Sequence, residues 1–582
     1  MKKILYSSNF SKASTGFGRH ARTVLTHLYS TGKYEIVEYA AAPYTFNHPR
    51  CKTVPWKCYG ALADSPEAYG ILNNDPKFMR QIAYGAWNLD KVVKEEKPDI
   101  FIACEDIWAF DGAERDGIKM PPLWEREWWN KIPCVIWTPV DSLPIFPLLT
   151  ENADKIKNLW VKAPFAENEL HRLGYGHVKT VPALIDDKPF KPLDRKVISG
   201  IRNSLGITDD MPIFGFVFRN QLRKLVITLL EGFKKYKDQN PESKAKLHLH
   251  THFNNGQWDI PRAIKELGLN NNDILCTYIC RHCKKIILSP FRGQKQNCAA
   301  CRTKESISNP DHDFGVTEEE LNIIYNIYAF NGGYIHPVTS GGFEMPILEA
   351  IYAGAPAATV PYAFGTNFVD NGIADTIESK TNVWEEGSLF IKAQPSADSV
   401  YELMSKYANM TLEERTQLST ERRNKALELF QAEKHLIELE KFIDEQPETD
   451  YNFNFTGFIP EPVNIAKWFL PTKKKRLLYT MPGSNGDCLV SLSVLESLKR
   501  IYPIEEWDFY VATSPQFMEI FKHLDWVTTI PFHPLMENYK LMEGCGDEPG
   551  LVNICFMPHL LTQRLHSYHH NGEDICELQK YE

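Results

Sequence analysis

The sequence predicts an α/β protein of several domains, because short buried strands alternate with amphipathic helices along most of the chain. A helix is expected over residues 18–29, where Val24, Leu25 and Leu28 share one face. Runs of β-branched and aromatic residues predict buried strands before residue 190, at residues 3–6, 98–103, 133–137 and 158–161. Strands separated by helices form parallel sheets, so we expect a doubly wound sheet in this part of the chain.

The same alternation returns after a polar stretch at residues 186–212, which is typical of an interdomain linker. Strands are expected at residues 213–218, 246–250, 274–279 and 357–360, with helices between them at 225–236, 260–267 and 318–328. Residues 413–445 should form one long helix or two, since Leu, Glu, Lys and Arg dominate there. A third, smaller α/β unit is expected at residues 473–582, after an aromatic and Pro-rich linker at residues 446–472.

Length and composition describe a folded protein without a large excess of charge. A chain of 582 residues is too long for one hydrophobic core, and 43% hydrophobic with 24% charged residues is ordinary for globular domains. The net charge of −9, from 65 Lys and Arg against 74 Asp and Glu, excludes a chain-wide attraction to nucleic acid. The N-terminus becomes polar too early for a signal peptide and no apolar run is long enough to span a bilayer, so we expect a cytoplasmic protein.

The segment at residues 340–350 carries the clearest chemical signal. A Gly341-Gly342 turn leads into the first turn of a helix, where unpaired N–H groups and a partial positive charge favour a diphosphate. Glycine lets the backbone approach phosphate oxygens closely. Glu349, further along this helix, can accept hydrogen bonds from the vicinal hydroxyls of a sugar, so the segment predicts a nucleotide-sugar site.

Arg219 and Lys224 follow the strand at residues 213–218, at the end of the sheet where open α/β proteins bind ligands. An arginine can fork onto phosphate oxygens and a lysine adds a point charge, so this pair can stabilise the charge of a departing diphosphate. Two solvated loop charges are the alternative. The glycine turn elsewhere in the same unit favours the functional interpretation.

These motifs resemble the retaining GT-B glycosyltransferases of the family-four type over residues 1–445. The family has a Gly-rich loop after its first strand, which Gly16 and Gly18 match as donor-binding residues, and an Arg with a Lys five residues later, which Arg219 and Lys224 match. It also has two glutamates with seven residues between them. Of that motif the chain keeps Gly342, Phe343, Pro346, Glu349 and Ala350.

The resemblance implies two Rossmann-like domains facing a cleft, an acceptor domain at residues 1–190 and a nucleotide-sugar donor domain at residues 191–445. It implies that Arg219 and Lys224 act on the diphosphate as catalytic residues. The implied donor-binding residues in the second domain are Gly341, Gly342, Phe343 and Glu349.

The chain departs from the family at the first of the two glutamates, where Gly341 stands. In the family this carboxylate contacts the donor sugar. Glu344 lies three residues further on, and we hypothesise that it takes over this catalytic role if the turn brings it to the same face. An acidic residue that only stabilises the helix dipole is the alternative.

Asp106 is the candidate that would orient the acceptor hydroxyl, because it follows the strand at residues 98–103 and a carboxylate at a strand's carboxyl end faces the ligand edge. A loop or helix-capping acid is the alternative. The Asp311-His312-Asp313 string, just before a helix, is better explained as a loop or cap, so no catalytic metal is expected.

Two CxxC pairs are the strongest isolated motif, formed by Cys280, Cys283, Cys298 and Cys301. Four thiolates at this spacing predict one tetrahedral structural zinc in a ribbon inserted at residues 276–305. Lys284, Lys285, Arg292 and Lys295 make the ribbon basic, and a basic ribbon can contact a phosphate backbone. A solubilised knuckle that only stabilises the insertion is the alternative.

The C-terminal unit resembles the first domain of family-nine heptosyltransferases, since residues 483–487 form a Gly-rich turn between a strand and a helix, with Asp487 after Gly486. Residues 473–582 leave no room for the partner domain that binds the donor in that family, so we expect a docking or vestigial domain.

The sequence therefore predicts an enzyme that transfers a sugar from a nucleotide-sugar donor to a hydroxyl acceptor with retention of configuration. Two alternatives stay open. One is a glycosyltransferase that acts on modified bases of a nucleic acid bound through the basic zinc ribbon. The other is an inactive nucleotide-sugar-binding or scaffold protein, in which the change to Gly341 ended catalysis.

Overall fold

The computed structural model describes residues 1–63, 76–115, 118–253, 256–293, 295–311, 314–458, 465–483, 485–533, 536, 539–545 and 548–558. Its contacts divide the chain into two units. The first comprises Met1–Leu62, Tyr84–Gly112 and Met120–Phe458, and the second comprises Ala63–Ala83, Ala113–Lys119 and Ile459–Glu582. No helix among the described residues has the length and apolar character needed to cross a bilayer.

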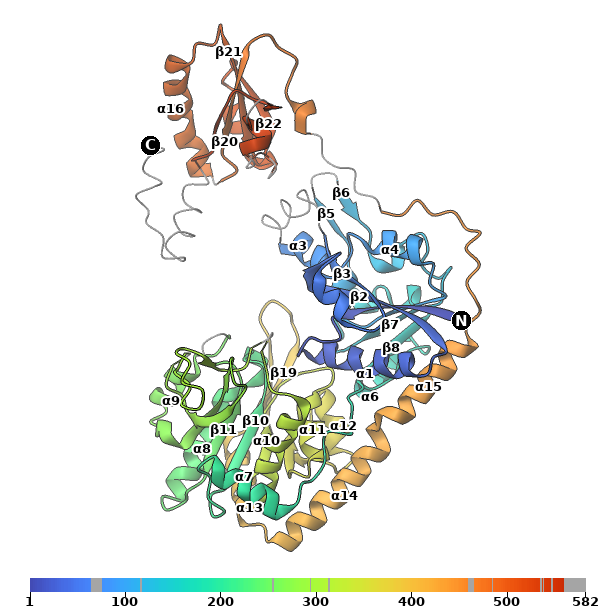
Figure 1. The fold of residues 1–582 in the computed structure, drawn as a ribbon, viewed down its shortest axis with the longest axis vertical. Coiled ribbons are helices and arrows are strands. Elements are labelled where there is room, and N and C mark those ends of the chain that lie inside the picture. Colours follow the sequence, from blue (N-terminus) through green and yellow to red (C-terminus); the bar gives the residue numbers. More distant parts are fainter. Residues whose placement is uncertain are drawn as a thin grey trace. The chain divides into compact units, whose positions relative to one another are not determined.

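The first unit begins with a seven-stranded, fully parallel sheet in the order β3-β2-β1-β4-β7-β8-β9 (Figure 1). Its strands are β1 (Lys2–Asn9), β2 (Tyr34–Thr45), β3 (Lys57–Leu62), β4 (Ile100–Ala103), β7 (Cys134–Thr138), β8 (Asn158–Val161) and β9 (Lys179–Thr180). Its helices are α1 (Gly16–Ser30), α4 (Leu89–Glu96), α5 (Pro147–Thr150) and α6 (Pro164–Arg172). The strand order reverses between β1 and β4, and such a switch point is where doubly wound sheets bind ligands.

A second sheet of eight strands follows in the order β13-β12-β11-β10-β15-β16-β17, with β14 paired to β12. Its strands are β10 (Ile213–Val217), β11 (Lys246–His250), β12 (Ile274–Cys280), β13 (Ile286–Pro290), β14 (Ile307–Ser308), β15 (Gly333–His336), β16 (Ala357–Thr359) and β17 (Asp375–Thr376). Its helices are α7 (Arg195–Ser204), α8 (Val226–Gln239), α9 (Ile260–Glu266), α10 (Glu318–Asn331), α11 (Met345–Tyr352), α12 (Phe364–Val369) and α13 (Ala397–Asn409), and β18 (Ser379–Trp384) pairs with β19 (Ile391–Pro395). The order reverses between β10 and β15, which places the second switch point beside the predicted diphosphate residues.

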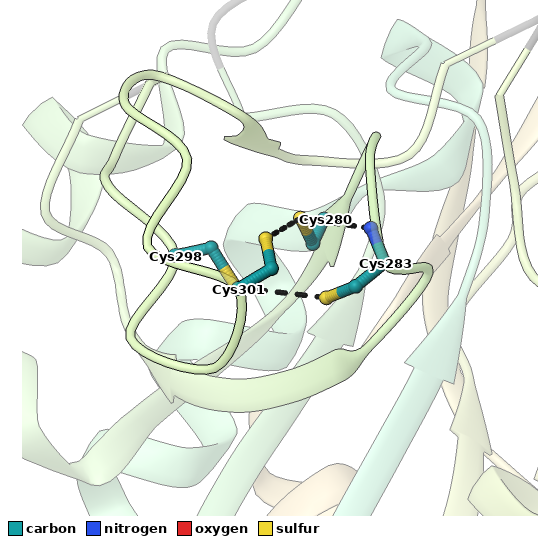
Figure 2. A group of neighbouring side chains, drawn as sticks. All are labelled: Cys280, Cys283, Cys298 and Cys301. Atoms are coloured by element: carbon teal, nitrogen blue, oxygen red, sulfur yellow. Dashed lines mark hydrogen bonds between the residues drawn. The ribbon is translucent and has the colours of Figure 1, made fainter.

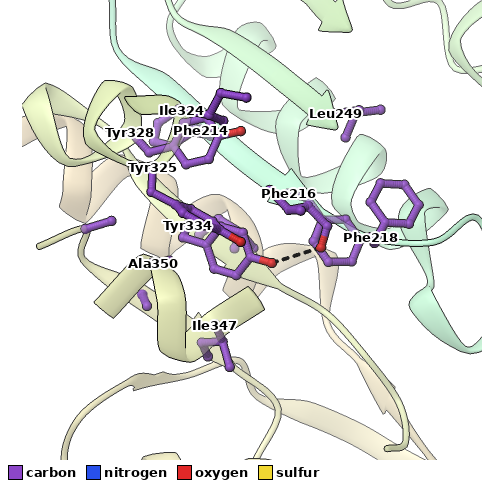
Figure 3. Close-up of a cluster of buried hydrophobic side chains, with 14 of the residues drawn as sticks. Phe214, Phe216, Phe218, Leu249, Ile324, Tyr325, Tyr328, Tyr334, Ile347 and Ala350 are labelled. Atoms are coloured by element: carbon purple, nitrogen blue, oxygen red, sulfur yellow. Dashed lines mark hydrogen bonds between the residues drawn. The ribbon is translucent and has the colours of Figure 1, made fainter. Parts of the chain in front are cut away.

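Aromatic side chains from β10, α10 and β15 fill the core of the second sheet (Figure 3). Gly215 makes room for this packing, since a Cβ atom there would lie 2.2 Å from the Tyr328 ring. The buried Tyr334 hydroxyl donates a hydrogen bond to the Val217 carbonyl at 3.1 Å, so its polar atom is satisfied. This packing fixes the position of the carboxyl end of β10 relative to β15.

Two helices, α14 (Leu412–Phe430) and α15 (Ala432–Glu445), follow one another with only Gln431 between them (Figure 1). Ala426 and Phe430 of α14 belong to the core of the second sheet, whereas Leu436 and Leu439 of α15 pack with Ile4, Tyr6 and Ile102 of the first. The chain thus returns to its first sheet, and the predicted helical stretch is two helices.

The predicted linker at residues 186–212 is wrong in part, because α7 forms within it. Asp194 caps α7, accepting hydrogen bonds from the Lys196 and Val197 N–H groups. The fully buried Arg202 donates to the carbonyls of Ile327 and Met211, which ties α7 to the second sheet. Its polar composition resembles that of a linker, because the residues that α7 contacts, such as Ile327, lie more than a hundred positions further along the chain. Residues 446–458 also lie against the first sheet, where the Tyr451 hydroxyl donates to the Pro98 carbonyl at 2.6 Å.

The second unit contains a smaller parallel sheet in the order β22-β21-β20-β25, made of β20 (Lys475–Thr480), β21 (Trp507–Thr513), β22 (Val527–Pro531) and β25 (Ile554–Phe556). Helices α16 (Asn485–Ile501), α17 (Tyr539–Met542) and α3 (Pro76–Ala83) and the short strands β5 (Ala113–Arg115), β6 (Ile118–Met120), β23 (Gly544–Cys545) and β24 (Glu548–Pro549) complete it. The third α/β unit is thus confirmed. Its resemblance to heptosyltransferases stays a prediction, and Ser484 of the predicted turn lies outside the described residues.

Candidate active site

Arg223, Lys224 and Glu344 form a largely buried ion cluster between the loops that follow β10 and β15. The Arg223 Nη1 atom lies 2.5 Å from one carboxylate oxygen of Glu344, and the Lys224 Nζ atom lies 2.5 Å from the other. The side chains of Lys224 and Glu344 are only 5% and 7% exposed. His336, the last residue of β15, places its Nε2 atom 3.6 Å from the same carboxylate.

Two cations of this cluster face the Glu344 carboxylate, and the charge of the nearby Asp141 acts on both cations as well. Burial by itself raises the pKa of Glu344, but the charges of Lys224 and Arg223 outweigh it and lower the pKa to about 2. Burial, and then the charge of Arg223, lowers the pKa of Lys224 to about 8 although Glu344 acts in the opposite direction. The two neighbouring cations can bind an incoming anion, which in turn would raise the pKa of Lys224.

Close contacts at Gly341 and Gly342 leave no space for a side chain at either position. A Cβ atom on Gly341 would lie 2.7 Å from the Glu344 Oε1 atom, so the Glu344 carboxylate occupies the space that a side chain at position 341 would enter. The Gly341 N–H group donates to the Asp141 carbonyl at 2.8 Å, and a Cβ atom on Gly342 would lie 2.2 Å from Pro139. The Gly341-Gly342 turn therefore packs directly against the loop that follows β7.

Glu349 lies fully buried in α11, and its carboxylate is paired with Arg19 of α1. The Arg19 Nη1 atom lies 2.6 Å from Oε1 of Glu349, and the Tyr325 hydroxyl donates to Oε2 at 2.8 Å. The Arg19 Nε atom also donates to Glu318, at the start of α10, at 3.0 Å. Glu349, the carboxylate predicted to bind a sugar, thus links α10 and α11 to the first turn of α1.

The Gly-rich loop before α1 is shaped by Thr15 and Gly18. The Thr15 hydroxyl accepts a hydrogen bond from the Gly18 N–H group at 3.0 Å and caps the helix. A Cβ atom on Gly18 would lie 2.7 Å from the carbonyl oxygens of Phe10 and Ala13, whereas the same position on Gly16 is open. Gly18 is therefore needed for the loop, and Gly16 leaves room for a group that approaches the backbone.

Asp106 lies with Glu105 and Asp141 at the carboxyl ends of β4 and β7. Burial, and then the charge of Asp141, raises the pKa of Asp106 to about 7, with Lys162 and Arg223 acting in the opposite direction. Burial, and then the charge of Asp106, raises the pKa of Glu105 to about 8. Carboxyl groups at this edge of the sheet can accept or donate hydrogen bonds to an acceptor hydroxyl.

Asp106→Asn is expected to raise the midpoint of thermal unfolding at pH 8 and to leave it unchanged at pH 4. A carboxyl whose folded-state pKa of about 7 lies above its ordinary 3.8 weakens the fold progressively as the pH rises between these values. Thermal unfolding followed at both pH values checks this. The exposed Asp154→Asn variant serves as the control, and a stability gain of equal size at pH 4 and pH 8 would contradict the expectation.

Arg219 and Phe343 are the predicted site residues whose side chains the structure directs elsewhere. Arg219 is exposed, and no described residue pairs with it, while its neighbour Arg223 makes the contact with Glu344. Phe343 packs between Phe368 and Phe430, with ring centroids 5.9 and 5.7 Å away, so its side chain serves the core. The catalytic role of Arg219 and the donor-binding role of Phe343 stay predictions.

Sequence reasoning missed Arg19 and Arg223 as members of the site. Arg19 directly follows Gly18, and Arg223 directly precedes Lys224, so each adjoins a motif residue. Adjacency was the only available signal, because the partners Glu349 and Glu344 lie more than a hundred residues away in sequence.

The four cysteines of the two CxxC pairs converge on one point (Figure 2). Their sulfur atoms lie within 4.8 Å of one another, with Cys280 and Cys301 3.6 Å apart and Cys283 and Cys298 3.7 Å apart. Bonds of about 2.3 Å to a tetrahedral zinc would space the sulfur atoms by about 3.8 Å. The set therefore fits a four-coordinate metal ion. Of the Asp311-His312-Asp313 string, His312 and Asp313 lie outside the described residues.

Comparison with known proteins identifies the fold. No protein-family model and no curated protein matches the chain. Sucrose-phosphate synthase from Thermosynechococcus elongatus matches with a TM-score of 0.51 at 13% identity, over 76% of this chain and 99% of its own. The N-terminal domain of trehalose-6-phosphate phosphatase from Candida albicans matches with a TM-score of 0.51 at 10% identity, over 76% and 96% of the two chains.

The chain has the GT-B fold. The predicted fold class is thus confirmed, with two Rossmann-like sheets, a cysteine ribbon inserted in the second and a smaller α/β unit after them. The closer resemblance to the family-four type stays a prediction. Since GT-B proteins differ in chemistry, activity has to be argued from the site.

Proposed function

We propose that this protein is a retaining glycosyltransferase, which moves a sugar from a nucleotide-sugar donor to a hydroxyl acceptor. The observation that carries the proposal is the buried cluster of Arg223, Lys224 and Glu344 at the switch point of the second sheet. Two cations side by side at this switch point suit the diphosphate of a donor. Sucrose-phosphate synthase, one of the fold neighbours named above, is by its name an enzyme of sugar chemistry.

In the proposed reaction the bond between the anomeric carbon and the diphosphate breaks while a bond to the acceptor oxygen forms on the same face. The electron pair leaves with the diphosphate, where Lys224, Arg223 and the N–H groups after Gly341 offset the negative charge. The acceptor proton passes to the departing phosphate. Glu344 would accept hydrogen bonds from the donor sugar, from the place beside Gly341 that its carboxylate occupies.

Asp106 and Glu105 would hold the acceptor on the side of the first sheet, and Glu349 would accept hydrogen bonds from the ribose. We propose a structural zinc at Cys280, Cys283, Cys298 and Cys301, since four thiolates leave no open position for chemistry. The unpaired state of the described cysteines suits a reducing compartment, and we propose the cytoplasm. No observation favours the nucleic-acid or scaffold alternative.

Release of nucleoside diphosphate from a panel of nucleotide sugars tests the proposal. One donor at a hundred times its dissociation constant should stabilise the protein by about 2.7 kcal/mol and should be consumed when acceptor sugars are added. Lys224→Met should lower the rate by about a hundredfold or more, because the leaving group loses its buried cation.

The exposed Lys265→Met variant on α9 is the matched control and should turn over like the wild type. The anomeric configuration of the product, read by NMR, tests retention separately. A protein that neither binds nor consumes any donor would overturn the proposal, and an inverted product would overturn only its stereochemistry.

A further inference from the structure

The cysteine ribbon starts at the ligand edge of the second sheet. In the parallel register Val217 of β10 lies opposite His250 of β11, and Leu249 lies opposite Cys276 of β12. Val217, the last residue of β10, is therefore level with Thr277, and the first ribbon cysteine, Cys280, follows three residues later. Neighbouring strands lie about 4.8 Å apart, so the backbones of Val217 and Thr277 are about 10 Å from each other.

Cationic side chains of the ribbon gather around Phe314 on the segment that leaves it. The Arg281 guanidinium carbon lies 4.7 Å from the centroid of the Phe314 ring, and the Lys284 Nζ atom lies 4.4 Å from it. Asp311 and Ser308 hold Arg281, at 2.5 and 3.1 Å, and the Arg281 side chain stays half exposed. The Phe314 ring, the Arg281 guanidinium and the Lys284 ammonium group therefore lie next to one another where the chain leaves the ribbon.

The same segment faces the first domain. A Cβ atom on Gly315 would lie 3.9 Å from the hydroxyl oxygen of Ser14, in the Gly-rich loop before α1. Three residues further on, Glu318 is paired with Arg19 at 3.0 Å, and Arg19 is paired with Glu349. The ribbon's exit is therefore continuous with the residues that we propose bind the donor.

We infer that the zinc ribbon forms the wall of the nucleoside subsite, with Arg281, Lys284 and Phe314 recognising the base half of the donor. This inference rests on the proposed function. Lys224, Arg223 and the Gly341 turn would bind the phosphates, and the ribbon begins about 10 Å from the end of β10 at the same edge of the sheet. A base can stack on a guanidinium plane, and ammonium groups donate to base carbonyl oxygens. The metal keeps the ribbon folded and so makes donor binding depend on zinc.

Calorimetric binding of UDP, GDP and ADP to the full-length protein tests the inference, with inorganic pyrophosphate as the ligand that lacks a nucleoside. The double variant Arg281→Ala/Lys284→Ala should weaken the preferred nucleoside diphosphate by about tenfold or more and leave pyrophosphate affinity and zinc content unchanged. The exposed ribbon variant Lys304→Ala, which alters the charge of the same ribbon, should bind like the wild type.

Cys283→Ser/Cys301→Ser should lose zinc by elemental analysis and weaken the same nucleoside diphosphate, with far-UV circular dichroism close to that of the wild type. Unchanged nucleoside diphosphate affinity in the Arg281/Lys284 variant, or equal weakening of pyrophosphate, would overturn the inference while the proposed function stands. A wild-type protein that binds no nucleoside diphosphate would overturn both.

Discussion

Glu344→Gln is expected to lower turnover by about 10²–10³-fold and to lower the free energy of unfolding by about 3–5 kcal/mol. The variant leaves Arg223 and Lys224 facing each other in a buried site without their carboxylate. It also removes the group that we propose holds the donor sugar. Nucleoside diphosphate affinity should be kept or increased, because Glu344 no longer competes for the two cations. Chemical denaturation, donor turnover and calorimetric binding measure the three quantities.

The pH dependence of stability gives a second readout for Glu344. Its folded-state pKa of about 2 lies below the ordinary 4.5, so its ionised form stabilises the fold above pH 4.5 and that contribution is lost as the pH falls toward 2. The stability difference between wild type and Glu344→Gln should therefore narrow between pH 5 and pH 3. Glu421→Gln, an exposed change on α14, is the control. Wild-type turnover in Glu344→Gln would show that position 344 does not replace the absent glutamate.

Arg19→Gln is expected to lower the free energy of unfolding by about 3–5 kcal/mol, since it leaves the fully buried Glu349 carboxylate without a cation. Tyr325 still donates one hydrogen bond, but a neutral hydroxyl compensates only part of the charge. Because the pair joins α1 to α11, the loss should also loosen the contact between the two Rossmann-like domains. Chemical denaturation and small-angle scattering measure the two effects.

A double-mutant cycle with Glu349→Gln isolates the Arg19–Glu349 contact, and we expect a coupling energy of about 1–3 kcal/mol. Arg22→Gln is the matched control in the same helix. Its guanidinium lies 2.7 Å from Glu318 but the side chain is 37% exposed, so the effect should stay within about 1 kcal/mol. Additive single effects of Arg19→Gln and Glu349→Gln would mean that the contact contributes nothing to the fold.

The Gly341 turn and the cysteine pairs show what a local pattern can predict. The two glycines precede a helix, and the two CxxC pairs form one four-sulfur cluster as expected, because chain spacing alone dictates these geometries. The hypothesis that Glu344 stands in for the absent glutamate stays a prediction; its carboxylate lies 2.7 Å from where a Cβ atom of residue 341 would be. That position depends on the path of a turn, which spacing does not specify.

The sequence by itself determined the alternation of strands and helices, hence two doubly wound sheets and a smaller third, because burial periodicity is a local property of the chain. Only the tertiary structure decided which charges pair. Arg223 rather than Arg219 reaches Glu344, and Arg19 rather than solvent meets Glu349. Ion pairs between distant segments depend on strand order, register and burial, and these arise from the packing of the whole domain.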